Sequence, residues 1–336
     1  MRYVGLDVHW RQSTFCVLDA NGKTLCTRTI VGPWDKVLLA LGQVKPPFAV
    51  CFEASTGYGY LYERLGAMAA KVIVAHPGQL RLIFRSKRKN DRVDAAKLAK
   101  LLYLDEVPPV YVPGLEVRDW RSLLEHRQRL LQERTRAKNQ VRALLRQHGV
   151  KAPRGLWTKA GMKWLLSQGF AGAGTALQRD LLCERIGSLH GMVKRVEAEL
   201  ANIASRHPGV ALLRTIPGVG LRTAEAVLAY IDDPERFASV KAVAAYFGVV
   251  PCQDQSAQKQ RLGHITRQGP ATVRKLLTEA AWVAIRRSPT VKAYFERLHH
   301  GDVDRRKIAV TATAHYLLRV MHAMLRTGEV WRGEAA

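Results

Sequence analysis

The order of strand-like and helix-like segments in the first 76 residues constrains the fold more than any other feature of the sequence. Segments rich in β-branched and aromatic residues predict strands, and segments with apolar residues three or four apart predict helices. In order, we expect strands over 3–9, 13–19 and 24–31, a helix over 34–43, a strand over 48–53, a helix over 58–70 and a strand over 71–76. A meander followed by strand–helix alternation is an α/β pattern with a mixed sheet, as in ribonuclease H-type folds, although other α/β folds share it.

Two turn signals refine this expectation. Asn21-Gly22 between the second and third strands predicts a type I′ hairpin. Pro77-Gly78 is expected to close the α/β unit after its last strand.

The pattern becomes helical after the Pro-rich stretch at 107–113. Residues 120–145 predict one long helix, and a second helix carries an unbroken four-three spacing typical of a coiled-coil seam: Leu182, Ile186, Leu189, Val193, Val196, Leu200 and Ile203. The seven-residue repeat does not say which chain supplies the partner helix. We favour oligomerisation through 182–203, and an antiparallel pair within one subunit is the alternative. Residues 150–175, rich in Gly, Ala and Lys, are interpreted as a hinge or tip.

These shifts predict three domains, over 1–110, 111–206 and 207–336. The last is expected to be compact and mostly helical, with a helix-hairpin-helix-like element around 212–230. There, Gly218 and Gly220 are expected to let backbone N–H groups face a phosphate at a helix N-terminus. An ordinary connection between two helices is the alternative.

The charge balance indicates a polyanionic partner. Lys and Arg number 53 against 28 Asp and Glu, a net charge of +25, and each of the three segments carries part of the excess. Nucleic acid is the usual partner of such a chain; a membrane surface or an unrelated basic role is the alternative. The sequence contains no apolar run of about 18 residues and no secretory signal, so we expect a cytoplasmic protein that does not span a membrane.

Four carboxylates stand out. Asp7 lies within an apolar strand, and Glu53 ends another, where each is costly unless it is paired or binds a metal. Asp91 and Asp94, three residues apart, share one face near the start of a helix. Singly, each has a structural explanation, such as hydrogen bonding or helix capping. Together they predict a site for Mg²⁺ or Mn²⁺, and two ions about 4 Å apart would suit in-line attack on a phosphodiester.

Basic side chains are expected to contact the nucleic-acid backbone near these carboxylates and along the long helix, with a solvated basic surface as the alternative. They are Lys87, Arg88, Lys89, Arg92, Arg127, Arg134 and Lys138.

Three motifs carry a resemblance to a known family. GLDVH at 5–9, FEASTGYGY at 52–60 and KNDRVDAAKLAKLL at 89–102 resemble the DEDD motifs of transposases of insertion-sequence family one-hundred-and-ten, whose N-terminal domain is RuvC-like. Segments of the second half, among them LLRTIPGVGLRTAEAVLAYI and QRLGHITRQGPATVRKLLTEAAW, are similar to the C-terminal domain of that family. The resemblance covers nearly the whole chain and is weakest over 150–175.

The resemblance implies a metal-binding tetrad of Asp7, Glu53, Asp91 and Asp94 and a serine nucleophile. In the loop over 251–263 the only serine is Ser256. Two departures occur: Ala257 stands where many relatives have Gly, and EASTGYGY carries one residue more than the common E-A-T-G pattern.

A serine hydroxyl needs a base or a metal to become a good nucleophile. His264 is eight residues away, so the metal site is the better activator. Residues Lys259, Arg261 and Arg267 flank the serine and are expected to hold scissile phosphates.

The expected function is therefore a nucleoid-associated DNA transposase. As the family implies, it excises its element as a circle and inserts it at a target chosen by an element-encoded bridge RNA. We expect a dimer that assembles into a tetramer on the element ends and target. One rival is a RuvC-like endonuclease that hydrolyses branched DNA with metal-activated water. Another is a non-catalytic scaffold that binds DNA or RNA.

Overall fold

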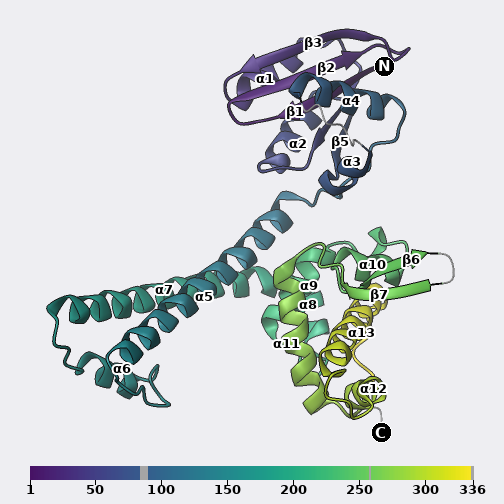
Figure 1. Cartoon of the computed structure of the whole chain (residues 1–336). Helices are drawn as coiled ribbons and strands as arrows, with labels where there is room; N and C mark the ends of the chain where they lie inside the picture. The colour runs from purple at the N-terminus through teal and green to yellow at the C-terminus, as the bar shows by residue number, and fades with distance from the viewer. Residues whose placement is uncertain (84–89, 257–258, 334–336) are drawn as a thin grey trace. The chain divides into compact units, whose positions relative to one another are not determined.

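The computed structural model describes residues 1–83, 90–256 and 259–333, with only the backbone described at Ser256, Lys259 and Gln260. Contacts within the chain divide it into two compact units, Met1–Leu115 and Glu116–Ala336 (Figure 1). Each unit has its own buried cores, and each is described below by itself.

The first unit is a mixed five-stranded sheet with flanking helices, as the sequence predicts. Its strands are β1 (Arg2–Val8), β2 (Gln12–Leu18), β3 (Thr24–Val31), β4 (Phe48–Glu53) and β5 (Lys71–Ala75), and its helices are α1 (Trp34–Leu41), α2 (Tyr58–Gly66), α3 (Pro77–Ile83) and α4 (Asp91–Tyr103). The spatial order is β3-β2-β1-β4-β5. The first three strands pair antiparallel, whereas β4 pairs parallel with β1 and with β5. This order places β1 at the centre of the sheet.

The two faces of the sheet are covered differently. Val4 and Leu6 of β1 pack with residues of α1 and α2 in one large apolar cluster. On the other face, the small residues Cys16 and Cys51 lie against α4. Because side chains alternate along a strand, Gly5 and Asp7 belong to the α4 face.

Both turn predictions are wrong in detail. Gly22 has a φ of +77°, but Asn21 does not have a positive φ, which a type I′ turn requires at both central residues. Instead, Asp19 Oδ1 accepts hydrogen bonds from the backbone N–H groups of Asn21 and Lys23, 2.9 Å each, and closes a longer loop. Pro77 begins α3 rather than ending the unit, because proline suits the first turn of a helix, where no N–H partner is needed.

The second unit is mostly helical. Its elements are α5 (Leu115–Gln147), α6 (Lys159–Leu166), α7 (Ala173–Ser205), α8 (Pro208–Leu213), α9 (Leu221–Ile231), η1 (Pro234–Arg236), α10 (Val240–Tyr246), β6 (Pro251–Ser256), β7 (Lys259–Ile265), α11 (Ala271–Arg287), α12 (Pro289–His299) and α13 (Arg306–Thr327).

The two long helices α5 and α7 pair antiparallel within one chain (Figure 1). Leu189 and Val193 of the seven-residue repeat are buried with Leu130 of α5, and Ile186 is buried with Val141. The repeat therefore packs as an antiparallel helix pair within one subunit, which is the alternative interpretation. The apolar seam expected to join two chains is covered by α5 of the same chain. Residues 150–175 are not a bare hinge, since α6 packs Leu165 into a small core at the tip of this pair.

The C-terminal helices share one core with the base of the α5–α7 pair. Trp120 and Leu200 are buried with residues of α9, α11 and α13. Of the residues that the structure describes, one helix, α13, is long and apolar enough to cross a membrane, but half of that stretch is buried in the protein. A core helix passes the same test, so this is weak evidence for a membrane span.

Candidate functional site

The sheet register brings Asp7 and Glu53 to one place. In the parallel β1–β4 pair, Leu6 lies opposite Phe52. The next residue on each strand, Asp7 and Glu53, therefore lies near the carboxyl end of its strand and beside the other. Both follow small residues, Gly5 and Cys51, on the face that α4 covers. Two carboxylates from distant parts of the chain therefore lie at neighbouring positions on the same face of the sheet, Asp7 half-buried and Glu53 exposed.

Helix α4 supplies the other two carboxylates from its first turn. The helix begins after Asn90, whose side chain accepts a hydrogen bond from the backbone N–H of Arg92 (3.0 Å). Asp91 and Asp94 follow at once, where the positive end of the helix dipole favours negative charge.

Gly5 is the reason that α4 lies so close to β1. A Cβ atom at Gly5 would lie 2.1 Å from the carbonyl oxygen of Ala95 and 2.2 Å from the backbone nitrogen of Ala99. Only a residue without a side chain permits this approach. Since Ala95 lies one turn after Asp91, the contact places the acidic first turn beside Asp7.

The carboxylates influence one another. Burial raises the pKa of the Asp7 carboxyl, the neighbouring His9 lowers it, and the charges on Asp91, Asp94 and Glu53 raise it again. Asp7 therefore lies close enough to Asp91, Asp94 and Glu53 for their charges to act on it, and the use of these four residues as one metal-binding tetrad stays a prediction.

Two further residues, which sequence reasoning did not select, belong to this cluster. His9 Nε2 lies 3.6 Å from Asp7 Oδ1, and Gln12 Nε2 donates a hydrogen bond to Asp91 Oδ2 over 3.1 Å. The sequence signal for His9 is its position at the end of GLDVH, two residues after Asp7.

The donor set fits a divalent cation. Among the described residues, single ligand atoms of Asp7, His9 and Asp91 lie within 4.8 Å of one another. Carboxylate oxygens are the ligands of Mg²⁺ and Mn²⁺, and Mn²⁺ also accepts an imidazole. Like charges held this close are most stable with a cation among them. Lys97, with Nζ 3.8 Å from Asp94 Oδ1, supplies part of that charge.

The basic side chains around the aspartates are only partly described. Arg92 is exposed on α4, where a nucleic-acid backbone can reach it. Lys87, Arg88 and Lys89 lie outside the described residues.

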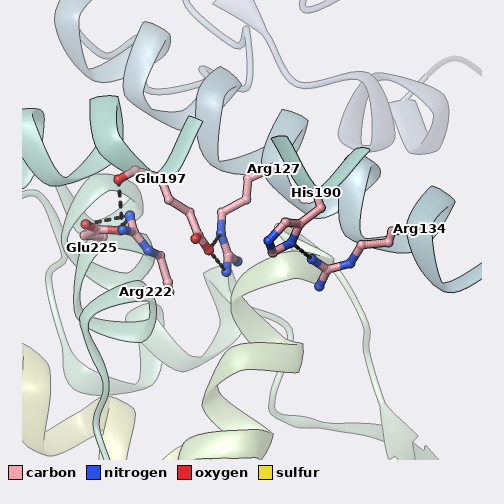
Figure 2. A network of polar contacts seen from close by, with 6 residues as sticks. All are labelled: Arg127, Arg134, His190, Glu197, Arg222 and Glu225. Carbon is pink, nitrogen blue, oxygen red and sulfur yellow. Dashed lines mark hydrogen bonds and ion pairs between the residues drawn. The ribbon is translucent and has the colours of Figure 1, made fainter. Parts of the chain in front are cut away.

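The three basic residues selected on α5 face partners within the chain. Arg127 Nε donates to Glu197 Oε1 over 2.8 Å, and an Arg134 nitrogen lies 3.4 Å from His190 Nδ1 (Figure 2). The Lys138 ammonium lies 4.9 Å from the centre of the Trp157 ring. Each of the three side chains therefore has a partner within the protein, and the expected contact of these side chains with nucleic acid stays a prediction.

The same network continues to a buried glutamate. Arg222 donates to both carboxylate oxygens of Glu225, over 2.9 and 2.7 Å, and to the backbone carbonyl of Glu197, over 3.1 Å (Figure 2). Glu225 is fully buried. Burial raises the pKa of Glu225 to about 7, although the Arg222 and Arg127 charges act to lower it.

Ser256 lies in the second unit, and its surroundings differ from the expected loop. Residues 251–256 and 259–265 are strands of a two-stranded antiparallel sheet, with Ser256 at the end of β6 paired with Lys259. Arg261 and Arg267 are exposed, and Arg267 has a positive φ of 56°. The side chains of Ser256 and Lys259 lie outside the described part of the chain.

The two glycines selected for phosphate contact are not equivalent. Gly218, with a φ of +92°, lies so close to α11 that a Cβ atom would be 2.5 Å from the backbone nitrogen of Ala284. Its missing side chain therefore serves helix packing. Gly220 is exposed at the N-terminus of α9, with open space beside it, and can still approach a phosphate.

The fold and the acidic residues together indicate a class of protein. A cluster of acidic residues at the carboxyl ends of a mixed sheet, in a chain of net charge +25, is typical of metal-dependent enzymes that act on nucleic acid.

Comparison with known proteins identifies the family. Residues 4–150 match a DEDD-type transposase model, and residues 210–296 match the model described as "Transposase IS116/IS110/IS902 family". A transposase of the insertion sequence element IS1111A from Coxiella burnetii is 27% identical over 99% of this chain and 92% of its own. A putative transposase from Sinorhizobium fredii, y4qE, is 29% identical over 94% of this chain and 80% of its own. The chain therefore belongs to the IS116/IS110/IS902 family and is an enzyme that acts on DNA.

Proposed function

We propose that the protein is the transposase of an insertion sequence and cuts and rejoins DNA through Ser256, assisted by Mg²⁺ at Asp7, Glu53, Asp91 and Asp94. The observation that supports the proposal is that ligand atoms of Asp7 on β1 and Asp91 on α4 lie within 4.8 Å of each other, while Asp94 and Glu53 are near enough for their charges to act on Asp7. We assign the first unit to the RuvC-like class on the same grounds, because its central strand and the parallel neighbour each carry an acidic residue near the carboxyl end.

The chemistry is a transesterification. Ser256 Oγ loses its proton and forms a bond to the scissile phosphorus, the bond from phosphorus to the 3′ oxygen breaks, and that oxygen takes up a proton. The 3′ hydroxyl of another strand then attacks the phosphoserine and releases the serine. Mg²⁺, when bound, lowers the pKa of a hydroxyl and stabilises charge on the phosphate oxygens. The chain's own part is to hold the carboxylates in place and to bring Ser256 to them, from the same chain or from a neighbouring one.

The remaining parts of the proposal concern partners. Synapsis of element ends and target requires several active sites, so the protein acts as a dimer that assembles into a tetramer, in the cytoplasm on nucleoid DNA. An element-encoded bridge RNA selects the target by base pairing, while Arg92, Arg261, Arg267 and the backbone at Gly220 contact phosphates without reading sequence.

The decisive experiment traps the covalent intermediate. The protein is incubated with labelled element-end DNA, bridge RNA and Mg²⁺, denatured, and analysed for a DNA-linked species whose attachment site is mapped by mass spectrometry. The matched control is Ser188→Ala, which alters an exposed serine on α7. We expect Ser256→Ala to abolish the adduct and Ser188→Ala to leave it unchanged.

The rival functions give other results. A hydrolase that uses water would continue to cut DNA in Ser256→Ala without any adduct. A non-catalytic scaffold would form no adduct, and Asp7→Asn would leave its function intact. Either result would refute the proposed mechanism.

A further inference from the structure

A group of solvent-exposed aromatic rings lies beside the carboxylate site, and neither the fold nor the proposed chemistry accounts for it. We call Trp10, Trp34 and Tyr60 the aromatic shelf. Trp10 lies two residues after the end of β1 and is 66% exposed, and Tyr60 of α2 is 44% exposed. Trp34 begins α1 and lies between them, partly buried against the main core of the unit.

The rings form one continuous surface. The centres of Trp10 and Trp34 are 5.0 Å apart with their planes at 79°, and Trp34 stacks on Tyr60 with 6.1 Å between centres. Gly57, with a φ of +83°, makes room for this arrangement, because a Cβ atom there would lie 2.1 Å from the edge of the Trp34 indole. The first glycine of the EASTGYGY motif, Gly57, therefore makes room for Trp34.

The shelf is tied to the carboxylate site. Trp34 Nε1 donates a hydrogen bond to the carbonyl oxygen of His9 over 3.2 Å. His9 is also fixed by the Ser13 hydroxyl, which bonds to its backbone N–H and carbonyl groups over 3.3 and 3.1 Å. The imidazole of His9 lies 3.6 Å from Asp7. One backbone segment, 7–10, thus carries both a carboxylate of the cluster and the most exposed ring of the shelf.

The chemistry of the shelf fits an unpaired nucleobase. Trp10 contributes little to the core, so its exposed ring area is open to a ligand with a flat π-face. Stacking of a base on an aromatic side chain contributes about 1–3 kcal/mol and tolerates any base. Exposed cationic residues accompany the rings, Arg11 next to Trp10 and Lys36 two residues after Trp34, and a nucleic-acid strand would place its phosphates near them.

We propose that the aromatic shelf stacks an unpaired base of the nucleic-acid strand and so positions the neighbouring phosphate at the carboxylates. The inference rests on the proposed function, since it assigns the substrate segment of that same site. A base within a duplex has both faces stacked and cannot use the shelf. The protein is therefore expected to prefer strands that contain unpaired bases at this position.

The test measures binding of the full-length protein without cleavage. The probes are a labelled oligothymidine of about 15 nucleotides and a duplex of equal length, in Ca²⁺ without Mg²⁺. The variant is Trp10→Ala, Trp10→Phe is the conservative variant, and Leu39→Ala, which alters an exposed residue of α1 (73% exposed), is the matched control. From the stacking range above, Trp10→Ala should weaken oligothymidine binding about 5-fold to 150-fold and duplex binding less than about twofold.

A second readout reports on the ring itself. Oligothymidine should quench tryptophan fluorescence of the wild-type protein, and Trp10→Ala should lose part of that quenching. Trp10→Phe should retain most of the affinity, and Leu39→Ala should behave as wild type in both measurements.

Each contrary outcome has one meaning. Unchanged oligothymidine binding by Trp10→Ala overturns the inference. If Trp10→Ala also differs from wild type in molar mass by light scattering, the shelf is instead a contact between copies of the chain. The proposed function is tested separately by Asp7→Asn. If Asp7→Asn still cleaves DNA while Trp10→Ala loses single-strand binding, the proposed function fails and the inference about the shelf holds.

Discussion

The two polar clusters of the molecule treat buried negative charge in opposite ways. Burial is the main reason that the pKa of Asp7 is raised, the charges of three further carboxylates add to the rise, and the nearby His9 offsets it only in part. Glu225 is more deeply buried, yet it faces Arg222 directly, with Arg127 close enough to lower its pKa. The first cluster gathers charges of one sign, whereas the second balances them within the protein.

This difference distinguishes a candidate metal site from a polar network that only supports the fold. A buried carboxylate that holds an arginine has its hydrogen bonds completed inside the fold, although the raised pKa of Glu225 shows that the arginines offset the cost of burying its charge only in part. Carboxylates that repel one another lower the stability of the protein unless a cation comes from outside. The Asp7 cluster is therefore expected to depend on added metal, and the Glu225 network is expected to be indifferent to it.

The largest expected effect is on catalysis. Asp7→Asn should lower DNA cleavage at least about 10³-fold, because loss of one strong electrostatic contact to the transition state costs about 4 kcal/mol. The measurement is the rate of strand cleavage in Mg²⁺ with element-end DNA. In the absence of metal the same variant should be at least as heat-stable as wild type, because it removes a repulsive charge. Cleavage at the wild-type rate would exclude Asp7 from the chemistry.

A comparable effect on stability should come from the helix that carries two of the carboxylates. Gly5→Ala inserts a Cβ atom into the backbone of α4, so the helix must move away from β1. We expect a loss of about 3 kcal/mol in the free energy of unfolding, the upper part of the range for overpacking, together with reduced cleavage. The matched control is Gly66→Ala, since a Cβ atom at Gly66 meets nothing within 4 Å. Equal stability of the two variants would show that α4 does not require the glycine.

The sequence predicts the first unit well because its signals are local. Every expected strand and helix between residues 3 and 76 is present, and the apolar strands that carry Asp7 and Glu53 near their carboxyl ends lead to the carboxylates. Helix α4 and its two acidic residues follow from spacing alone. The contribution of Gly5 could not be foreseen, because it depends on which helix returns to cover β1.

The second unit is predicted less well because its sequence patterns are compatible with more than one structure. The same seven-residue repeat suits a partner helix in another chain or in the same one, and only the tertiary structure pairs Leu189 with Leu130. Likewise, the positive charge of Arg127 is visible in the sequence, but Glu197, seventy residues away, is not recognisable as its partner. Long-range pairing decides both cases.

The balanced cluster should respond to pH. The pKa of Glu225 is about 7 in the folded protein and near 4.5 in an unfolded chain, so the folded state binds this proton more tightly. Stability from this group is therefore greatest at low pH and decreases as pH rises from about 4.5 to 7. Between pH 5 and pH 8 the decrease should be about 2 kcal/mol. Glu225→Gln keeps a hydrogen-bond acceptor for Arg222 and should lack this component, so the difference between the two proteins isolates it in chemical denaturation. A pH dependence identical in both proteins would mean that Glu225 is ionised throughout.

The smallest effect is the most direct comparison of the two clusters, because it measures binding of metal rather than catalysis. A ligand that binds only the folded state stabilises it by RT ln(1 + [L]/Kd), about 1.4 kcal/mol at ten times Kd. Mg²⁺ should therefore raise the melting temperature of the wild-type protein and of Glu225→Gln by a few degrees relative to NaCl at equal ionic strength, and it should not raise that of Asp7→Asn. If Mg²⁺ stabilised Asp7→Asn as much as wild type, the cation would be binding elsewhere. The repulsion among the carboxylates would then be a cost that the fold carries without metal, as it carries the burial of Glu225.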